Sequence, residues 1–201
     1  MGMAHRESDA PAFHTADMVR ALLEEDRAWP RYETLYGELA VTPAPEGAHQ
    51  LLVRELVVEL ALYLRRWPVG HVFASPADIS WGRSDVLVQP DVFVVPAAQG
   101  REAVRLDGPG WGAVRRLVLA VEIVSPGSGR RDRFTKRVLY QREGVADYWV
   151  IDPARREAEV WTPDAEAPRV EHERLAWHPE GAGEPFAFEL TPRFDEVHGG
   201  G

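Results

Sequence analysis

Residues 117–140 read LVLAVEIVSPGSGRRDRFTKRVLY, and this stretch decides how the chain folds. Its first eight residues form an apolar run that is interrupted by one carboxylate, Glu122. After Pro126 and its Gly/Ser neighbours, the stretch continues as a basic segment that carries Lys136, the only lysine of the chain. The pattern predicts a buried strand, a turn and then a helix.

Glu122 and Lys136 each call for a physical explanation. A charged carboxylate inside a buried strand destabilises the fold by several kcal/mol unless it is compensated. A metal ion, a hydrogen-bond network or a nearby ammonium group could compensate it. Arginine fills 22 of the 23 basic positions, so the single lysine indicates a role that needs a compact ammonium. Chance retention of one lysine is the alternative.

Length and composition describe an ordinary globular protein. The 201 residues suit one domain, and 45% hydrophobic residues are enough for a proper core. There is no cysteine, which excludes disulfides, thiolate zinc sites and cysteine nucleophiles. Neither a signal peptide nor an apolar run of about 18 residues is present, so we expect a cytoplasmic protein without membrane segments. We predict a disordered leader over residues 1–13, one domain over 14–195 and a flexible tail over 196–201.

Charge is distributed unevenly along the chain. The net charge is −9, which argues against nonspecific attraction of the whole molecule to nucleic acid. Residues 101–137, however, contain nine Arg/Lys and four Asp/Glu. One segment is therefore basic on an otherwise acidic protein, either as a binding surface or as an ordinary solvated face.

Hydrophobic periodicity predicts alternating helices and strands. Helices are expected over 15–27 (with Thr15 as N-cap), 48–67 and 132–142, and a strand or hairpin over 32–41 with a turn or bulge at Gly37. Strand patterns cover 69–74, 77–81, 86–95, 117–124, 147–151 and 158–161, with weaker ones at 170–176 and 186–190, and residues 97–113 resemble a surface loop. This order predicts an α/β fold in which helices flank a mixed β-sheet.

Three acids interrupt apolar or strand-like stretches: Glu38, Asp91 and Glu122. Adjacent pairing of the strands that carry Asp91 and Glu122 would bring both carboxylates to one side of a sheet. Mg²⁺ or Mn²⁺ is bound in proteins through one or two carboxylates with carbonyls and waters. Lys136, about one turn into the next helix, can face back toward Glu122. A metal ion with an ammonium beside it is suited to phosphodiester hydrolysis.

Several stretches together resemble a known family. VQPDVFVV around Asp91, VLAVEIVSPGSGRRDRFTKRVLYQREGVADYWVIDP around Glu122 and Lys136, YETLYGELAVTPAP, the following AHQ and the closing EVW are similar to the Uma-type bacterial endonuclease family. That family falls within the PD-(D/E)XK, or restriction-endonuclease-like, superfamily. The similar stretches span residues 32–161. In the superfamily pattern the lysine lies two residues after the acid, where this chain has Val124, whereas the Uma-type group carries it in the following helix, as here.

The resemblance implies a restriction-endonuclease-like core and divalent-metal-dependent cleavage of DNA. By position, Asp91 and Glu122 would bind the metal, Glu38 would be a further acidic ligand, and Lys136 would be the catalytic lysine. The backbone carbonyl of Ile123 would complete the coordination. We expect a homodimer, since cleavage of two strands by one such site often uses two copies.

Other interpretations stay open at this point. Glu38 and Asp91 could be ordinary strand or turn acids, and His49 is expected to be a capping or packing residue. Arg130, Arg131, Arg133 and Arg137 could contact DNA phosphates or form a solvated helix face. The alternative function is a catalytically silent nuclease-like fold that binds nucleic acid or protein. A hydrolase of another phosphorylated substrate is a third possibility.

Overall fold

The computed structural model describes residues 12–23, 30–42 and 44–200 of the chain. Most of the predicted leader, the end of the first predicted helix, and residue 201 of the predicted tail lie outside these residues. Within them, no helix is both long enough and apolar enough to cross a bilayer.

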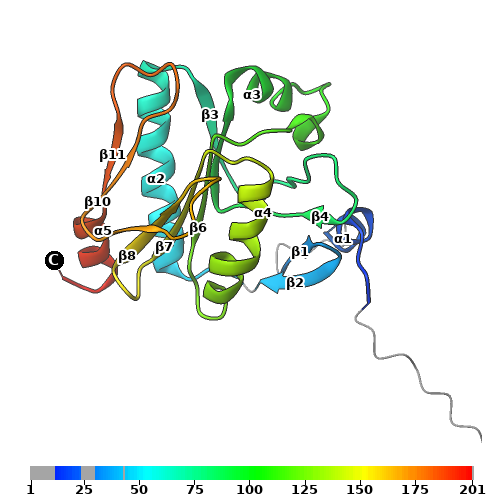
Figure 1. The fold of residues 1–201 in the computed structure, drawn as a ribbon, viewed down its shortest axis with the longest axis horizontal. Coiled ribbons are helices and arrows are strands. Elements are labelled where there is room, and N and C mark those ends of the chain that lie inside the picture. The colour runs from blue at the N-terminus through cyan, green and yellow to red at the C-terminus, as the bar shows by residue number, and fades with distance from the viewer. Residues whose placement is uncertain (1–11, 24–29, 43, 201) are drawn as a thin grey trace, which may run out of the picture.

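A mixed six-stranded sheet forms the centre of the molecule (Figure 1). Its strand order is β3-β5-β6-β7-β8-β9. The strands are β3 (Gly70–Ala74), β5 (Val92–Pro96), β6 (Leu119–Ile123), β7 (Asp147–Asp152), β8 (Glu157–Trp161) and β9 (Arg169–Glu171). β6 and β7 pair in parallel, and the other neighbours are antiparallel. The connection from β6 to β7 contains the π-helical segment η2 (Arg131–Lys136) and helix α4 (Arg137–Arg142), as a parallel crossover requires.

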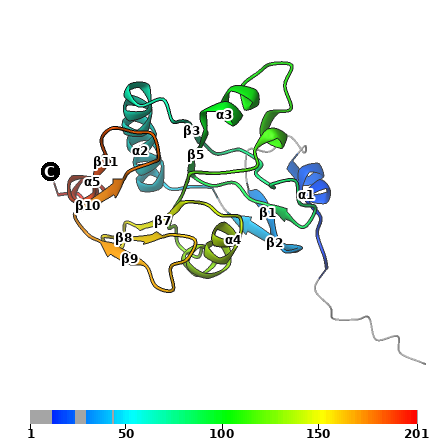
Figure 2. The same cartoon turned by 45° about the horizontal axis from the view of Figure 1, so that its top comes forward.

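One face of this sheet packs against helix α2 (Gly47–Arg66). Leucines at four-residue spacing along the helix, Leu52, Leu56, Leu60 and Leu64, are buried against the sheet. The hairpin of β10 (Arg174–Trp177) and β11 (Phe186–Glu189), together with helix α5 (Leu190–Val197), completes this layer beside α2 (Figures 1 and 2). Helix α5 runs into the stretch expected to be a flexible tail.

The opposite face is covered by α4, η2 and several irregular segments. Alternation along the strands divides the core: Val121, Ile123 and Trp149 face α2, whereas Ala120 and Val150 face the other layer. Residues two positions apart in a strand point to the same face, so the Glu122 side chain lies, like that of Ala120, on the α4 side of the sheet. The predicted fold, an α/β core with a mixed sheet flanked by helices, is confirmed.

A smaller sheet stands at the edge of the core. It contains β1 (Arg31–Leu35), β2 (Glu38–Thr42) and β4 (Val86–Leu87), and helix α1 (Ala16–Leu23) packs against it (Figure 2). The predicted cap of α1 is present, because Thr15 Oγ1 accepts the Met18 N–H at 3.2 Å. The hairpin turn has positive φ at Tyr36 and Gly37 (55° and 84°), the conformation of a type I′ turn.

Three predicted elements differ in the structure. The run 86–95 is divided into β4 and β5, because Pro90 cannot donate a backbone hydrogen bond to a neighbouring strand. Residues 77–81 form no strand and make one isolated bridge, from Ile79 to Val88. The expected loop 97–113 instead contains helix α3 (Ala97–Ala103) and a 3₁₀ turn, η1 (Gly110–Ala113), and Pro96 and Pro109 occupy the N-cap positions before them.

Candidate active site

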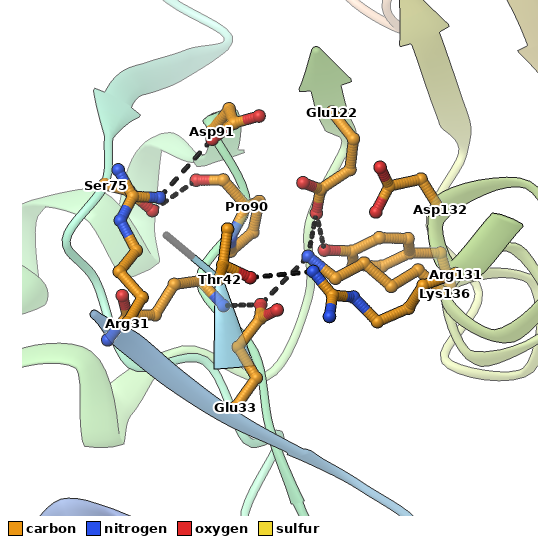
Figure 3. A network of polar contacts seen from close by, with 12 residues as sticks. Arg31, Glu33, Thr42, Ser75, Pro90, Asp91, Glu122, Arg131, Asp132 and Lys136 are labelled. Atoms are coloured by element: carbon orange, nitrogen blue, oxygen red, sulfur yellow. Dashed lines mark hydrogen bonds and ion pairs between the residues drawn. The ribbon is translucent and has the colours of Figure 1, made fainter. Parts of the chain in front are cut away.

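Lys136 and Glu122 form a buried ion pair (Figure 3). Glu122 is supplied by β6, and Lys136 is the last residue of η2. The Lys136 Nζ atom donates to Glu122 Oε1 at 2.9 Å, and the Tyr140 hydroxyl donates to the same oxygen at 2.9 Å. The buried carboxylate is thus compensated by an ammonium and by a hydrogen-bond network.

Glu33 of β1 is the second carboxylate that contacts the lysine. Its Oε1 atom lies 2.9 Å from Lys136 Nζ and also accepts the backbone N–H of Gln89 at 2.8 Å. Lys136 therefore joins the small sheet to the central sheet, because Glu33 belongs to β1 and Glu122 to β6. The smaller sheet is consequently a wall of the site.

Asp91 occupies the position immediately before β5. Extending the β5–β6 register (Val92 opposite Val121) places it opposite Glu122 on the same side of the sheet. Its Oδ2 atom accepts the Ile123 N–H at 2.9 Å and contacts His49 Nε2 at 2.9 Å. Its Oδ1 atom accepts a longer bond, 3.3 Å, from Arg31. These contacts hold the carboxylate in one orientation.

Asp132 is a fourth buried acid at the site. The π-helical hydrogen bond from Arg137 N–H to Asp132 O widens this turn. Asp132, Lys136 and Tyr140 follow one another at four-residue spacing, so they share one face of the helical segment toward the sheet. π-Helical turns occur frequently at functional sites.

These side chains enclose a small cavity, which we call the acid cavity. Its volume is about 30 Å³, enough for one water-sized species. Charged side chains dominate its lining, and the acids and the lysine among them are at most 8% exposed. The charged and titratable residues are Arg31, Glu33, His49, Asp91, Glu122, Arg131, Asp132 and Lys136.

The electrostatics of the acid cavity favour a protonated lysine. Burial opposes the charge on Lys136, but the carboxylates of Glu122, Glu33 and Asp132 outweigh it and raise its pKa well above the ordinary value. Complete burial raises the pKa of Glu122 well above its usual range, against the lowering effect of Lys136. Burial also opposes ionisation of Asp91, yet the bonds from His49 and Ile123 bring its pKa below the ordinary value. These contacts thus favour the ionised form of Asp91.

Three of the four predicted catalytic residues, Asp91, Glu122 and Lys136, line the acid cavity. Glu38 does not line it: it is an exposed residue at the start of β2. Register places it opposite Leu35, two positions beyond Glu33, so it is displaced by about 7 Å along the hairpin. The structure therefore corrects the expected position of Glu38. Of these two hairpin acids, Glu33 is the one that lines the acid cavity.

The four arginines proposed as phosphate contacts occupy different environments. Arg131 lines the acid cavity and donates to Thr42 Oγ1 at 2.7 Å. Arg133 is bound by three carboxylates, Asp152 at 2.9 Å, Glu157 at 3.6 Å and Glu159 at 2.5 Å.

Arg137 also makes contacts within the protein. It donates to the Arg133 carbonyl and to Gln141, and it stacks over the Trp161 ring. Arg130 is exposed. Of the four, Arg131 is therefore the residue at the cavity.

Sequence reasoning missed Glu33, Asp132 and the role of His49. Asp132 could have been found, because it lies four positions before Lys136 and helical spacing puts both on one face. His49 was expected to cap or pack, yet it contacts Asp91. Glu33 and Glu38 share one face of the hairpin, so the alternation of side chains along the strands does not indicate which of the two reaches the site.

Comparisons with known proteins identify a family and a similar fold. The model of the Uma2 family, described as "Putative restriction endonuclease", matches residues 16–192. A crystal structure of "a putative nuclease belonging to DUF820" from Anabaena variabilis has a TM-score of 0.69 and 22% sequence identity. The match covers 90% of this chain and 97% of the other, and shows the same fold. No curated protein matches. The chain, with its mixed sheet and buried acids, belongs to the Uma2 family of restriction-endonuclease-like proteins.

Proposed function

We propose that this protein is a divalent-metal-dependent endonuclease that hydrolyses phosphodiester bonds in DNA. One observation carries the proposal: the Lys136 ammonium lies 2.9 Å from both Glu33 and Glu122, in a cavity that Asp91 also lines. Membership of a restriction-endonuclease-like family supports a nuclease role.

The donors of the acid cavity suit Mg²⁺ or Mn²⁺. Its four carboxylates, from Glu33, Asp91, Glu122 and Asp132, supply hard oxygen atoms, and the cavity has room for one water-sized species. Among the described residues, no three His, Asp or Glu side chains form a ready-made metal cluster. Mg²⁺ commonly uses only one or two carboxylates and keeps several waters, so Asp91 and Glu122 with the Ile123 carbonyl are the expected ligands. When bound, the ion would lower the pKa of a water and neutralise charge on the phosphate.

Lys136 would act as a fixed positive charge. Its raised pKa keeps it protonated at neutral pH, so it cannot serve as a general base there. The ammonium has three N–H donors, of which Glu33 and Glu122 account for two. The third can donate to a phosphate oxygen or to the attacking water, stabilising the charge that develops in the transition state.

The neighbouring residues would position the acids. His49 and the Ile123 N–H orient Asp91, and Tyr140 orients Glu122. Hydrogen bonds to the side chains that bind a metal fix their orientation and affect the affinity for the metal. We expect Tyr140→Phe to reduce cleavage less than loss of either acid, because the Glu122–Lys136 pair remains.

Plasmid cleavage tests the proposal directly. We expect wild-type protein with Mg²⁺ or Mn²⁺ to nick or linearise a supercoiled plasmid, and Glu122→Ala and Lys136→Ala to lose at least 100-fold of that activity. Glu166→Ala, which removes an exposed acid, is the matched control and should cut like wild type. Equal cleavage by all four proteins would identify a contaminating nuclease and refute the proposal.

A catalytically silent binding module is the second candidate. The observation that favours it is the internal ion pair: Lys136 already partly neutralises Glu33 and Glu122, so the cavity is compensated without a metal. Calorimetric titration with Mn²⁺ separates the two functions. A site of one ion per chain that Asp91→Ala abolishes supports the nuclease, whereas no heat of binding supports the silent module.

A further inference from the structure

A second hollow opens beside the acid cavity, and we call it the side pocket. Its volume is about 360 Å³, and it lies at the carboxyl ends of the parallel strands β6 and β7, between the first turn of α2 and the end of α5. His49 and Ser125 line both hollows. The two hollows therefore adjoin at these residues.

The walls of the side pocket are largely apolar. They are formed by Ala48, Val124, Pro126, Pro153, Ala154 and Val197. His198 Nε2 contacts the Pro153 carbonyl at 2.9 Å, which ties the end of α5 to the turn after β7. Volumes of 300–1,000 Å³ with apolar walls and a few polar groups are typical of small-molecule sites. Flat, weakly polar groups such as nucleobases are held between apolar side chains in enzymes that act on extruded bases.

The charges around the side pocket do not favour a phosphate. Arg155 is the one arginine among its described lining residues. It already pairs with Asp152 at 3.8 Å and Glu157 at 3.4 Å. Glu46 and Asp152 add negative charge to the rim. The pocket thus suits the neutral part of a nucleotide, while the phosphate is left to the acid cavity.

His49 supplies a polar group at the junction of the two hollows. Its Nε2 atom contacts Asp91, whereas its Nδ1 atom is buried and has no hydrogen-bond partner among the described residues. Because an ionised Asp91 only accepts hydrogen bonds, Nε2 is the donor, and Nδ1 is left as a buried polar atom that can bond a ligand. A buried polar atom without a partner destabilises the structure. An amino or hydroxyl group of a bound nucleoside would satisfy it.

We propose that the side pocket takes one unpaired nucleobase of the substrate strand while an adjacent phosphate occupies the acid cavity. This inference rests on the proposed nuclease function and narrows its substrate to DNA with an unpaired nucleotide beside the cleaved bond. A paired base would first have to leave the duplex, at a cost of a few kcal/mol. The internal contacts of Arg133 and Arg137 agree with this, because binding through the duplex backbone needs several available cations.

Fluorescence anisotropy in Ca²⁺ tests the inference without cleavage. The probes are a fluorescein-labelled 12-nucleotide single strand and a duplex of the same sequence. We expect wild-type protein to bind the single strand at least five-fold more tightly. The double variant Ala48→Leu/Ala154→Leu narrows the side pocket, and it should lose at least five-fold affinity for the single strand with little change for the duplex. Ala187→Leu, at an exposed position of β11 outside both hollows, should bind like wild type.

Three results would overturn the inference: no measurable single-strand binding, equal or tighter duplex binding, or a double variant that binds the single strand like wild type. Thermal melting checks that both variants are folded. The plasmid assay keeps the two proposals separate. If Glu122-dependent plasmid cleavage is present but the binding preference is not, only the side-pocket inference fails. If cleavage is absent, the anisotropy comparison still decides whether the side pocket takes a base.

Discussion

At the scale of single residues, Glu33 and Glu38 provide a sharp test of the site. Glu33 contacts Lys136 inside the acid cavity, whereas Glu38 is exposed on the same hairpin. We expect Glu33→Gln to lower plasmid cleavage at least ten-fold, because the lysine loses one of its two anchors. Glu38→Gln should change cleavage less than two-fold. The reverse order of effects would mean that the hairpin docks differently in the active protein.

Lys136 also determines how stability depends on pH. Lys136→Met leaves Glu33 and Glu122 buried without their cation, which we expect to lower the free energy of unfolding by about 3–5 kcal/mol at pH 8. In the wild-type protein the pKa of Lys136 is raised above its ordinary value of 10.5. The stability that its charge contributes is therefore fully present below pH 10.5, and it is lost only as the pH rises through the higher pKa of the folded state.

The variant should recover stability in acid. The pKa of Glu122 is raised by burial, and without the lysine it rises further, so the folded variant takes up a proton as the pH falls. Urea unfolding at pH 5 and pH 8 measures this. A difference between wild type and variant that is equal at both pH values would contradict the assignment of an ion pair.

At the scale of elements, η2 carries two arginines with different expected roles. Arg133 links Asp152 at the end of β7 to Glu159 in the middle of β8, so Arg133→Ala should lower the free energy of unfolding by about 3 kcal/mol. Arg131 lies at the acid cavity, so Arg131→Ala should weaken DNA binding several-fold and reduce its salt dependence by about one phosphate contact. Urea unfolding and salt-dependent anisotropy on both variants separate these effects, and an exchange of the two outcomes would contradict the interpretation.

The irregular segment at Pro90 is the second element that shapes the site. Pro90 ends the strand pairing before β5, and Ser75 Oγ donates to the Pro90 carbonyl at 2.6 Å. Because of this break, Asp91 lies just outside the regular strand, and its Oδ2 atom accepts the Ile123 N–H at the end of β6. A proline that weakens the sheet therefore contributes to orienting the acid.

At the scale of the whole molecule, metal binding should appear as stability. An ion that binds the folded chain alone raises the free energy of unfolding by about 2.7 kcal/mol at 100 times its dissociation constant. We expect Mg²⁺ or Mn²⁺ to raise the melting temperature of wild type, and EDTA to reverse the shift. The melting temperature of Asp91→Ala should be the same with and without the ion. A shift of the same size in that variant would place the metal elsewhere.

The sequence by itself was enough to predict the helices and strands that form the core, and the two strands at which Asp91 and Glu122 lie. Apolar runs with clear periodicity, such as residues 48–67 and 117–124, fold as predicted because burial of their apolar faces overrides local alternatives. A carboxylate inside such a run needs compensation wherever it lies, so Glu122 could be singled out from the sequence. Asp91, beside a proline at a strand end, and the single lysine could be singled out as well.

Only the tertiary structure decided which other groups meet them. Glu33 reaches Lys136 because of the way the small sheet docks on the core, and no period in the hairpin sequence encodes that docking. His49 reaches Asp91 because α2 starts at the carboxyl ends of β6 and β7. Several residues separate Lys136 from the end of β6. The widened helical segment at residues 131–136 places Lys136 on the same face as Asp132. Such long-range contacts depend on packing between elements, which local sequence patterns do not specify.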